Sequence, residues 1–334
     1  MNYQIFWSLL FLAFLTACSN KNCDSNTVSQ RYIHKYGFEV SADEWLQRKG
    51  DGQIITAFKD GSTQTCAYKN GILHGATTLT YPKTQIIQEK DDYDEGTLCK
   101  KTFYNPQGLP SREEIYENEK NIITVWNNKG VPLSIEEYQD GKLINGQYFT
   151  SLNTLESSVV EGKGIRIKRN GEGKLLNKEN FANGALVSRT TFHPTGEIET
   201  ISHFIDYQLN GEQKTFAING SLVREAHWQN GQLHGKEICY QNNKKSFEVL
   251  YINGKKEGLE QEYQHNQLVH EVPWKNGLKH GMERTRYRDY TDIQWYFDGE
   301  AVDLASFKKL KNKELMIAEL EKAKSLFEAR KSVR

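Results

Sequence analysis

The chain has 334 residues, no net charge at pH 7 and a hydrophobic fraction of 37%. Gly is abundant, with 26 residues, and Tyr, Phe and Trp make up 11% of the chain. This composition favours thin, turn-rich β structure over a thick globular core. The lack of a basic excess argues against a dedicated nucleic-acid-binding protein, so we expect no nucleic-acid partner.

An apolar run opens the chain from Ile5 to Leu15. Its length of about eleven residues suits the core of a signal peptide and is too short to span a bilayer, which needs about 20. The next residues, Leu15-Thr16-Ala17-Cys18, resemble the lipobox of bacterial lipoproteins, which are cleaved before the cysteine and acylated on it. The resemblance implies a signal peptide at residues 1–17, palmitate or a similar acyl chain on Cys18, and a location in the cell envelope. Ser19 favours the outer membrane if the cell is Gram-negative. The alternative is an uncleaved signal anchor, because the first four residues contain no Lys or Arg.

Two segments separate this leader from the rest of the chain. Residues 18–30 are polar and are predicted to form a flexible, lipid-anchored tether. Residues 31–49 contain Ser41-Ala42-Asp43-Glu44, which resembles a capping box at the start of a short helix. We expect this second segment to be an N-terminal cap, because repeat arrays need a polar end.

Asn-Gly and Asp-Gly pairs recur along residues 50–300. They supply the residues that a two-residue type I′ turn requires, since both of its central positions have φ above zero. Successive pairs near the C-terminal end are 23 or 22 residues apart. The predicted turn glycines are Gly71, Gly141, Gly184, Gly231, Gly254, Gly277 and Gly299.

Aromatic residues recur with the same period, in two columns. The first column is Tyr68, Tyr93, Tyr116, Tyr138, Val160, Phe181, Phe204, Trp228, Tyr251, Trp274 and Phe297. The second is Tyr81, Tyr104, Trp126, Tyr148, Phe192, Phe216, Tyr240, Tyr263 and Tyr287. A missing aromatic residue and Val160 indicate a degenerate repeat at residues 150–175.

Alternation with a period of two residues, as at Phe247, Val249 and Tyr251, is typical of strands, so each repeat is predicted to be a β-hairpin. Aromatic residues in the same phase should lie on one face and stack across strands. The other face is predicted to be charged, with Lys236, Glu237, Glu260, Glu262, Glu283 and Arg284. The predicted fold is therefore all-β: an elongated single antiparallel sheet, or meander, of about eleven hairpin repeats.

The last segment, residues 301–334, changes character. Asp303 can cap a helix whose imperfect apolar stripe is Leu304, Phe307, Leu310, Ile317, Leu320 and Phe327. The favoured role is a C-terminal cap over the last strand edge. The alternative is a helix that binds a partner or a membrane surface, because residues 303–334 contain nine Lys or Arg and five acidic residues.

The repeat unit resembles the variant MORN repeat of bacteria. Its copies are NGILHG at Asn70–Gly75, NGQLHG at Asn230–Gly235, NGKKEG at Asn253–Gly258 and NGLKHG at Asn276–Gly281. The resemblance implies a protein-binding array, and bacterial members are often labelled as antitoxins of toxin–antitoxin systems. Eukaryotic MORN arrays are linked to membrane association and scaffolding.

Motifs for catalysis or metal binding are not found in the sequence. Gly162-Lys163-Gly164 lacks the spacing of a phosphate-binding loop and is interpreted as a turn. His74, His234 and His280 share one repeat position, and solvent-facing turn residues are favoured there over a row of metal ligands. The spacing of Cys23, Cys66, Cys99 and Cys239 supports no particular disulfide and no zinc site. We therefore expect no enzyme activity, cofactor or metal.

These features together predict a membrane-anchored lipoprotein that presents a β-repeat surface to a protein partner. The alternative is an antitoxin or immunity-type protein that neutralises a toxin by direct binding. A third hypothesis is an enzyme that acts on cell-wall glycan.

Overall fold

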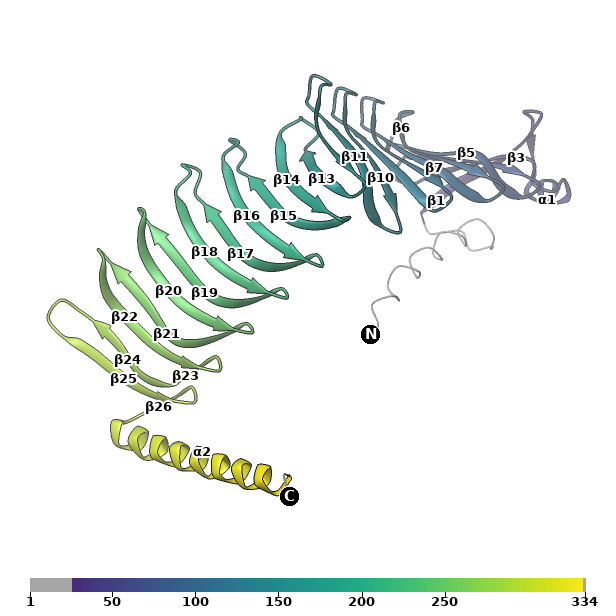
Figure 1. Cartoon of the computed structure of the whole chain (residues 1–334). Helices are drawn as coiled ribbons and strands as arrows, with labels where there is room; N and C mark the ends of the chain where they lie inside the picture. Colours follow the sequence, from purple (N-terminus) through teal and green to yellow (C-terminus); the bar gives the residue numbers. More distant parts are fainter. Residues whose placement is uncertain (1–25, 333–334) are drawn as a thin grey trace. The chain divides into compact units, whose positions relative to one another are not determined.

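The computed structural model describes residues 26–332 (Figure 1). The predicted signal peptide at residues 1–17, the predicted lipidation residue Cys18, and Cys23 lie outside the described residues. The first strand, β1, begins at Thr27. The predicted tether at residues 18–30 therefore extends too far, since its last four residues belong to a strand.

The chain divides into two units, residues 1–140 and 141–334. In the first unit, a small N-terminal element precedes a series of antiparallel hairpins. Its elements are β1 (Thr27–His34), β2 (Glu39–Val40), α1 (Ala42–Gln47), β3 (Gly52–Phe58), β4 (Thr63–Lys69), β5 (Ile72–Thr80), β6 (Ile87–Asp94), β7 (Thr97–Tyr104), β8 (Pro110–Glu117), β9 (Lys120–Trp126) and β10 (Pro132–Gln139). Strand β1 pairs with both β2 and β3, and each later strand pairs with the next.

The second unit continues the same pattern and ends in a helix. Its elements are β11 (Lys142–Phe149), β12 (Leu155–Val160), β13 (Lys163–Arg169), β14 (Leu175–Ala182), β15 (Ala185–Phe192), β16 (Ile198–Ile205), β17 (Gln208–Phe216), β18 (Leu222–Gln229), β19 (Gln232–Gln241), β20 (Lys244–Ile252), β21 (Lys255–Gln264), β22 (Gln267–Lys275), β23 (Leu278–Lys279), β24 (Gly281–Arg286), β25 (Thr291–Phe297), β26 (Glu300–Val302) and α2 (Leu304–Ser332). Every pairing between these strands is antiparallel. The predicted fold class, an open antiparallel meander of hairpins with a C-terminal helix, is confirmed.

The N-terminal cap contains the predicted helix. The Glu44 backbone N–H donates to the Ser41 hydroxyl at 3.2 Å, so Ser41 is the N-cap of α1. Trp45 of α1 is 5% exposed and packs with Val40 and Ile54. Its ring meets that of Tyr68 edge-on, with 6.1 Å between the centroids. This cap therefore buries the outer side of the first repeat, although β1 and β2 were not predicted.

Turns on one edge of each unit are linked to one another. In the turn at Asn253 and Gly254, φ is 50° and 77°, as a type I′ turn requires. The Gly254 N–H donates at 2.8 Å to the carbonyl of Leu233, which follows the previous turn. The same bond recurs one repeat later, from Gly277 to Lys256 at 2.9 Å. Gly231 and Gly299 make equivalent bonds, to Leu209 and Lys279, so each of these four turns is tied to the repeat before it.

The turns show that two residues of the first aromatic column were assigned wrongly. Tyr251 and Trp274 lie two residues before the first residue of their turns, Asn253 and Asn276. By the same rule, Val159 and Tyr296 occupy this position, in place of Val160 and Phe297. The exposure of the two valines supports this register, since Val159 is 1% exposed and Val160 is 60% exposed. The error arose because spacing between aromatic residues was used instead of the turns, which fix the register.

The middle repeat is only partly degenerate. Leu152 and Leu155 are 87% and 60% exposed, as expected for a poorly packed stretch. The neighbouring strands nevertheless hold some of the most deeply buried side chains of the unit, including Leu143, Tyr148 and Val159 at 2%, 0% and 1% exposure. The second-column position of this repeat holds Arg169 in place of an aromatic residue, while the buried Val159 fills the first-column position.

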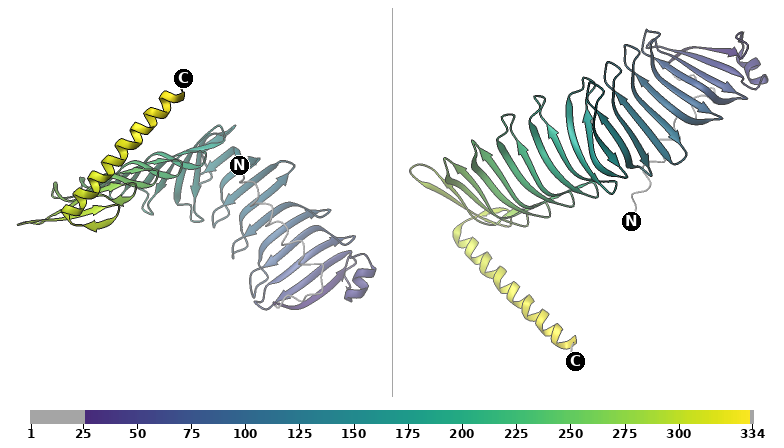
Figure 2. Two further views of the ribbon diagram at one scale, coloured as in Figure 1. Left: turned by 90° about the horizontal axis from the view of Figure 1, so that it is seen from below. Right: turned by 45° about the horizontal axis from the view of Figure 1, so that its top comes forward.

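Helix α2 begins as predicted. The Ser306 N–H donates to the Asp303 carboxylate at 2.8 Å, and the Phe307 N–H donates to the Asp303 carbonyl at 2.9 Å. Figure 2 shows α2 extending away from the last hairpin of its unit. The predicted apolar stripe does not cover the sheet edge along its whole length, because Ile317 and Leu320 are 46% and 68% exposed.

Candidate interaction surface

The two aromatic columns lie on opposite faces of the second unit. Alternate residues of a strand share a face, and Val249 pairs with Glu237 while Ile238 pairs with Glu248. The face of the first column, which we call the front face, carries Trp228, Tyr251, Trp274 and Tyr296 between strands β18 and β25. The back face carries Tyr240 and Tyr263 of the second column.

The front face has a floor of small side chains. The residue two positions before each of three successive aromatic residues is buried: Ala226 and Val249 are 0% exposed, and Val272 is 1% exposed. The aromatic residues themselves are half-buried, so they retain surface that a ligand could cover. This arrangement differs from a closed hydrophobic core.

Charged residues alternate with the front-face aromatic residues. Lys256 lies over the Trp274 ring, with its Nζ 4.8 Å from the centroid, and donates to Glu260. One repeat later, Lys279 lies 4.7 Å from the Tyr296 ring centroid and donates to Glu283 at 2.9 Å. A lysine, a carboxylate four residues later and the aromatic ring of the next strand thus form a repeated unit.

This repeated unit corrects the prediction of a separate charged face. The prediction placed Glu237, Glu260 and Glu283 opposite the aromatic column, but all three lie on the front face with it. Glu260 is only 8% exposed and directly opposes Val272 in the register. Acidic side chains can occupy such a position because a lysine or arginine is paired with each of them, as Arg224 is with Glu237 at 2.6 Å.

Burial and charge change the acidity of several groups on the front face. Burial, followed by the charge of Glu237, raises the pKa of Tyr251 to about 12. Burial acts to raise the pKa of Glu283, but hydrogen bonds from Lys279 and His270 outweigh it and hold that pKa below its ordinary value. Glu283 therefore remains a carboxylate at neutral pH.

The back face carries a second set of ion pairs around the other aromatic column. Glu248 accepts hydrogen bonds from Lys236 and Lys245, each at 2.7 Å, and these bonds lower its pKa. The Nζ of Lys245 also lies 4.5 Å from the Tyr263 ring centroid. The Tyr240 hydroxyl donates to Glu225 at 2.7 Å, which raises the pKa of Tyr240 to about 12.

The predicted turn glycines and aromatic residues are distributed along both units and do not converge on one pocket. Gly71, Tyr68, Tyr93 and Tyr138 belong to the first unit, whereas Gly141, Phe181, Gly184, Gly231, Gly254, Gly277 and Gly299 belong to the second. All seven glycines have φ between 73° and 90°. Their role is to form turns, as predicted.

The three equivalent histidines connect successive turns. The Nδ1 atoms of His234 and His280 lie 3.1 Å and 3.0 Å from the side-chain oxygens of Asn253 and Asp298 in the next turn. The Nδ1 atom of His74 accepts from the Glu95 N–H at 3.4 Å. Within residues 26–332, no group of three or more His, Cys, Asp or Glu is arranged to hold a metal ion. The interpretation as solvent-facing residues is wrong for His280, which is 8% exposed.

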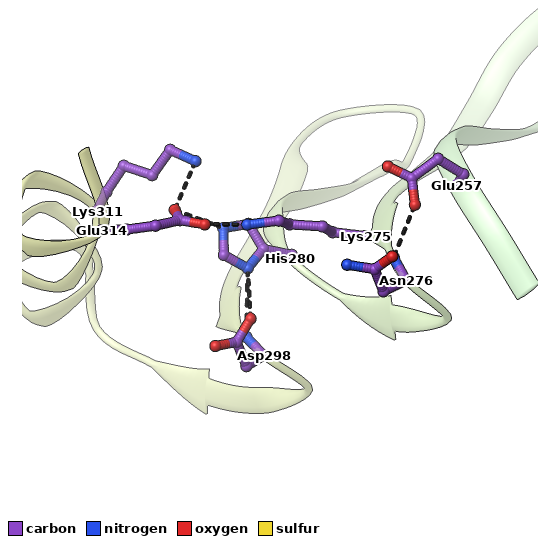
Figure 3. Close-up of polar contacts among 7 residues, drawn as sticks. All are labelled: Glu257, Lys275, Asn276, His280, Asp298, Lys311 and Glu314. Atoms are coloured by element: carbon purple, nitrogen blue, oxygen red, sulfur yellow. Dashed lines mark hydrogen bonds and ion pairs between the residues drawn. The ribbon is translucent and has the colours of Figure 1, made fainter. Parts of the chain in front are cut away.

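His280 is buried because helix α2 packs against the back face at this point (Figure 3). The Phe307 ring lies 6.2 Å from His280 and 4.8 Å from Trp295, measured between centroids. Glu314 of α2 accepts hydrogen bonds from Lys275 of β22 and, at 2.8 Å, from Lys311 of its own helix. These bonds lower the pKa of Glu314 to about 2. This junction was not predicted, because it depends on how the helix packs.

Comparisons with known proteins add no family to these observations. No protein-family model matches the chain, and a search of curated proteins finds no match either. No helix among residues 26–332 is both long and apolar enough to cross a membrane. The likeness to MORN repeats therefore stays a prediction that rests on the repeat motif and its turns.

Proposed function

We propose that this chain is a lipid-anchored protein of the cell envelope that binds a protein partner through the front face of its second unit. The observation that carries the proposal is the row of half-buried aromatic residues on this face, two of which, Trp274 and Tyr296, have a lysine over the ring. Aromatic residues contribute much of the binding energy of protein interfaces, because they bury a large area at a small cost in conformational entropy. Paired charges between them would fix the orientation of the partner.

Binding through the front face is tested by photo-crosslinking in the native cell. A photoreactive phenylalanine analogue in place of Tyr251 probes the front face. The matched control replaces Leu259, which is 49% exposed and opposes Pro273 on the back face. We expect a crosslinked protein from position 251 and not from position 259. Equal crosslinking at both positions, or none at position 251, would contradict the proposal. The identity of the crosslinked protein distinguishes the two hypotheses: an immunity protein would crosslink to a toxin, whereas a scaffold would crosslink to another kind of protein.

Lipid anchoring rests on the sequence Leu15-Thr16-Ala17-Cys18 alone. Wild-type protein should incorporate labelled palmitate, and Cys18→Ser should abolish that label. If the wild type never acquires the label, the anchor is absent, whatever the result of crosslinking.

A further inference from the structure

Helix α2 uses only its first three turns to contact the sheet. Phe307 and Leu310 are half-buried, and among the described residues Glu314 is the last of the helix with a hydrogen bond or ion pair to a strand. From Leu315 onward, every described side chain of α2 is exposed. The outer part of the helix is therefore open to other molecules.

Three exposed apolar residues of this outer part lie on a different side of the helix from Phe307 and Glu314. Met316, Ile317 and Leu320 are 65%, 46% and 68% exposed. At about 100° per residue, they occupy one arc of the helix surface, centred roughly 120° from Phe307 and Glu314; half-buried Leu310 borders this arc and exposed Leu315 lies outside it. The stripe predicted from the sequence looked imperfect because it combined residues from two sides of the helix.

Charges are separated around the same helix. Lys309, Lys313 and Lys324 are exposed and fall within the arc of Met316, Ile317 and Leu320. No ion pair involves these three lysines among the described residues. Acidic residues of the outer part, Glu319, Glu321 and Glu328, fall outside this arc. This arc of α2 thus combines apolar and basic side chains, and Glu328 lies just beyond its edge; we call the arc the basic-apolar side.

We propose that the basic-apolar side of α2 lies on a membrane surface that contains anionic lipids. Apolar side chains would enter the boundary between headgroups and acyl chains, while the lysines bind lipid phosphates. A lipid surface fits this pattern better than a protein groove does, because the lysines are interspersed with the apolar residues and do not border them on one flank. The proposal rests on the proposed function in one respect: the anchor at Cys18 would bring the helix close to a membrane.

The experiment uses the chain from Ser19 to Arg334, which keeps every described residue and has neither the leader nor the acylated cysteine. Binding is measured by flotation with vesicles of phosphatidylcholine alone and of phosphatidylcholine with a quarter phosphatidylglycerol. We expect binding to the anionic vesicles, weaker binding to the neutral ones, and a decrease with added salt.

Two matched pairs of variants assign the binding to one side of the helix. Lys324→Glu lies on the basic-apolar side, whereas Lys322→Glu makes the same charge change about 160° away. Leu320→Ser and Leu315→Ser, at 68% and 53% exposure, form the apolar pair. We expect Lys324→Glu and Leu320→Ser each to weaken binding at least about fivefold, and their controls to change it less than about twofold. Circular dichroism should show the same helix content in all four.

Several outcomes would overturn the proposal. These are no binding of the wild-type chain to anionic vesicles, equal losses within either pair, or a binding that salt does not weaken. If vesicles do not bind but Lys324→Glu abolishes the crosslink to a protein, the basic-apolar side belongs to a protein interface. Because this chain lacks Cys18, the result does not depend on acylation, and failure of the anchor is recognised separately by the palmitate label.

Discussion

Replacing Val159 and Val160 by Ala, one at a time, tests the register of the repeats. Both are adjacent valines of β12, but Val159 is 1% exposed and Val160 is 60% exposed. Val→Ala removes two methylene equivalents, worth about 1.6 kcal/mol at about 0.8 kcal/mol each. The cavity left in a packed site adds to this, so Val159→Ala should cost roughly 2–3 kcal/mol of unfolding free energy. Val160→Ala should stay within about 0.5 kcal/mol.

Urea unfolding followed by far-ultraviolet circular dichroism measures this difference. With a slope of about 2 kcal/mol per molar urea, Val159→Ala should lower the midpoint by about 1 M, and Val160→Ala should hardly move it. The slopes must agree between variants, because a change in slope would mean that the unfolding transition itself has changed. A larger effect at Val160, or equal effects at both positions, would refute the register and restore the spacing of aromatic residues as its basis.

Three further predictions concern glycines with positive φ, the junction of α2 with the sheet, and the tyrosine hydroxyl that donates to Glu225. Gly164→Ala should destabilise the second unit clearly more than Gly254→Ala in thermal unfolding, because a Cβ at Gly164 overlaps a backbone carbonyl, whereas at Gly254 only the φ of 77° opposes it. The pKa of Glu314 falls from 4.5 to about 2 in the docked helix, so its contribution to docking is complete above pH 4.5 and is lost as the pH falls through about 2. The hydrogen-exchange protection factors of the first turns of α2, which correct for the intrinsic pH dependence of exchange, should therefore be the same at pH 7 and pH 5, and Glu314→Gln should lower them at both. Glu225→Gln should lower the pKa of Tyr240 from about 12 towards its ordinary value of 10, seen as earlier tyrosinate absorbance in a pH titration.

The fold could be predicted from local sequence because each repeat carries its own turn signal. Asn253-Gly254 and Asn276-Gly277 specify turns with positive φ wherever they occur, and the strands between them follow by alternation. Asp303 likewise specified the start of α2 from its own neighbourhood. Before Glu161-Gly162 and before Asp298-Gly299 the assignment was wrong by one residue, because it followed the spacing of bulky side chains and did not count back from the turn.

The faces of the sheet could not be predicted in the same way. Glu260 was assigned to a solvated face because acids are usually exposed, but Lys256 from its own strand and Trp274 from the next one enclose it. The burial of an acidic side chain such as Glu260 depends on which side chains lie beside it on the neighbouring strands. Those neighbours are known only after the register of the strands is known. The junction of α2 was missed for a related reason: Glu314 and Lys275 are far apart in sequence, and neither belongs to a motif.

The bonds between successive turns bear on how such a chain can change its length in evolution. The Gly254 N–H donates to the carbonyl of Leu233, and the Gly277 N–H donates to the equivalent carbonyl of Lys256, so donors and acceptors in these repeats recur with the same period. A duplication or deletion of one whole period, such as residues 231–253, would rejoin equivalent donors and acceptors. An insertion of a few residues would instead leave turn N–H groups without partners. Recombination between repeats is therefore tolerated where small insertions are not, and the number of front-face aromatic residues can vary by whole repeats.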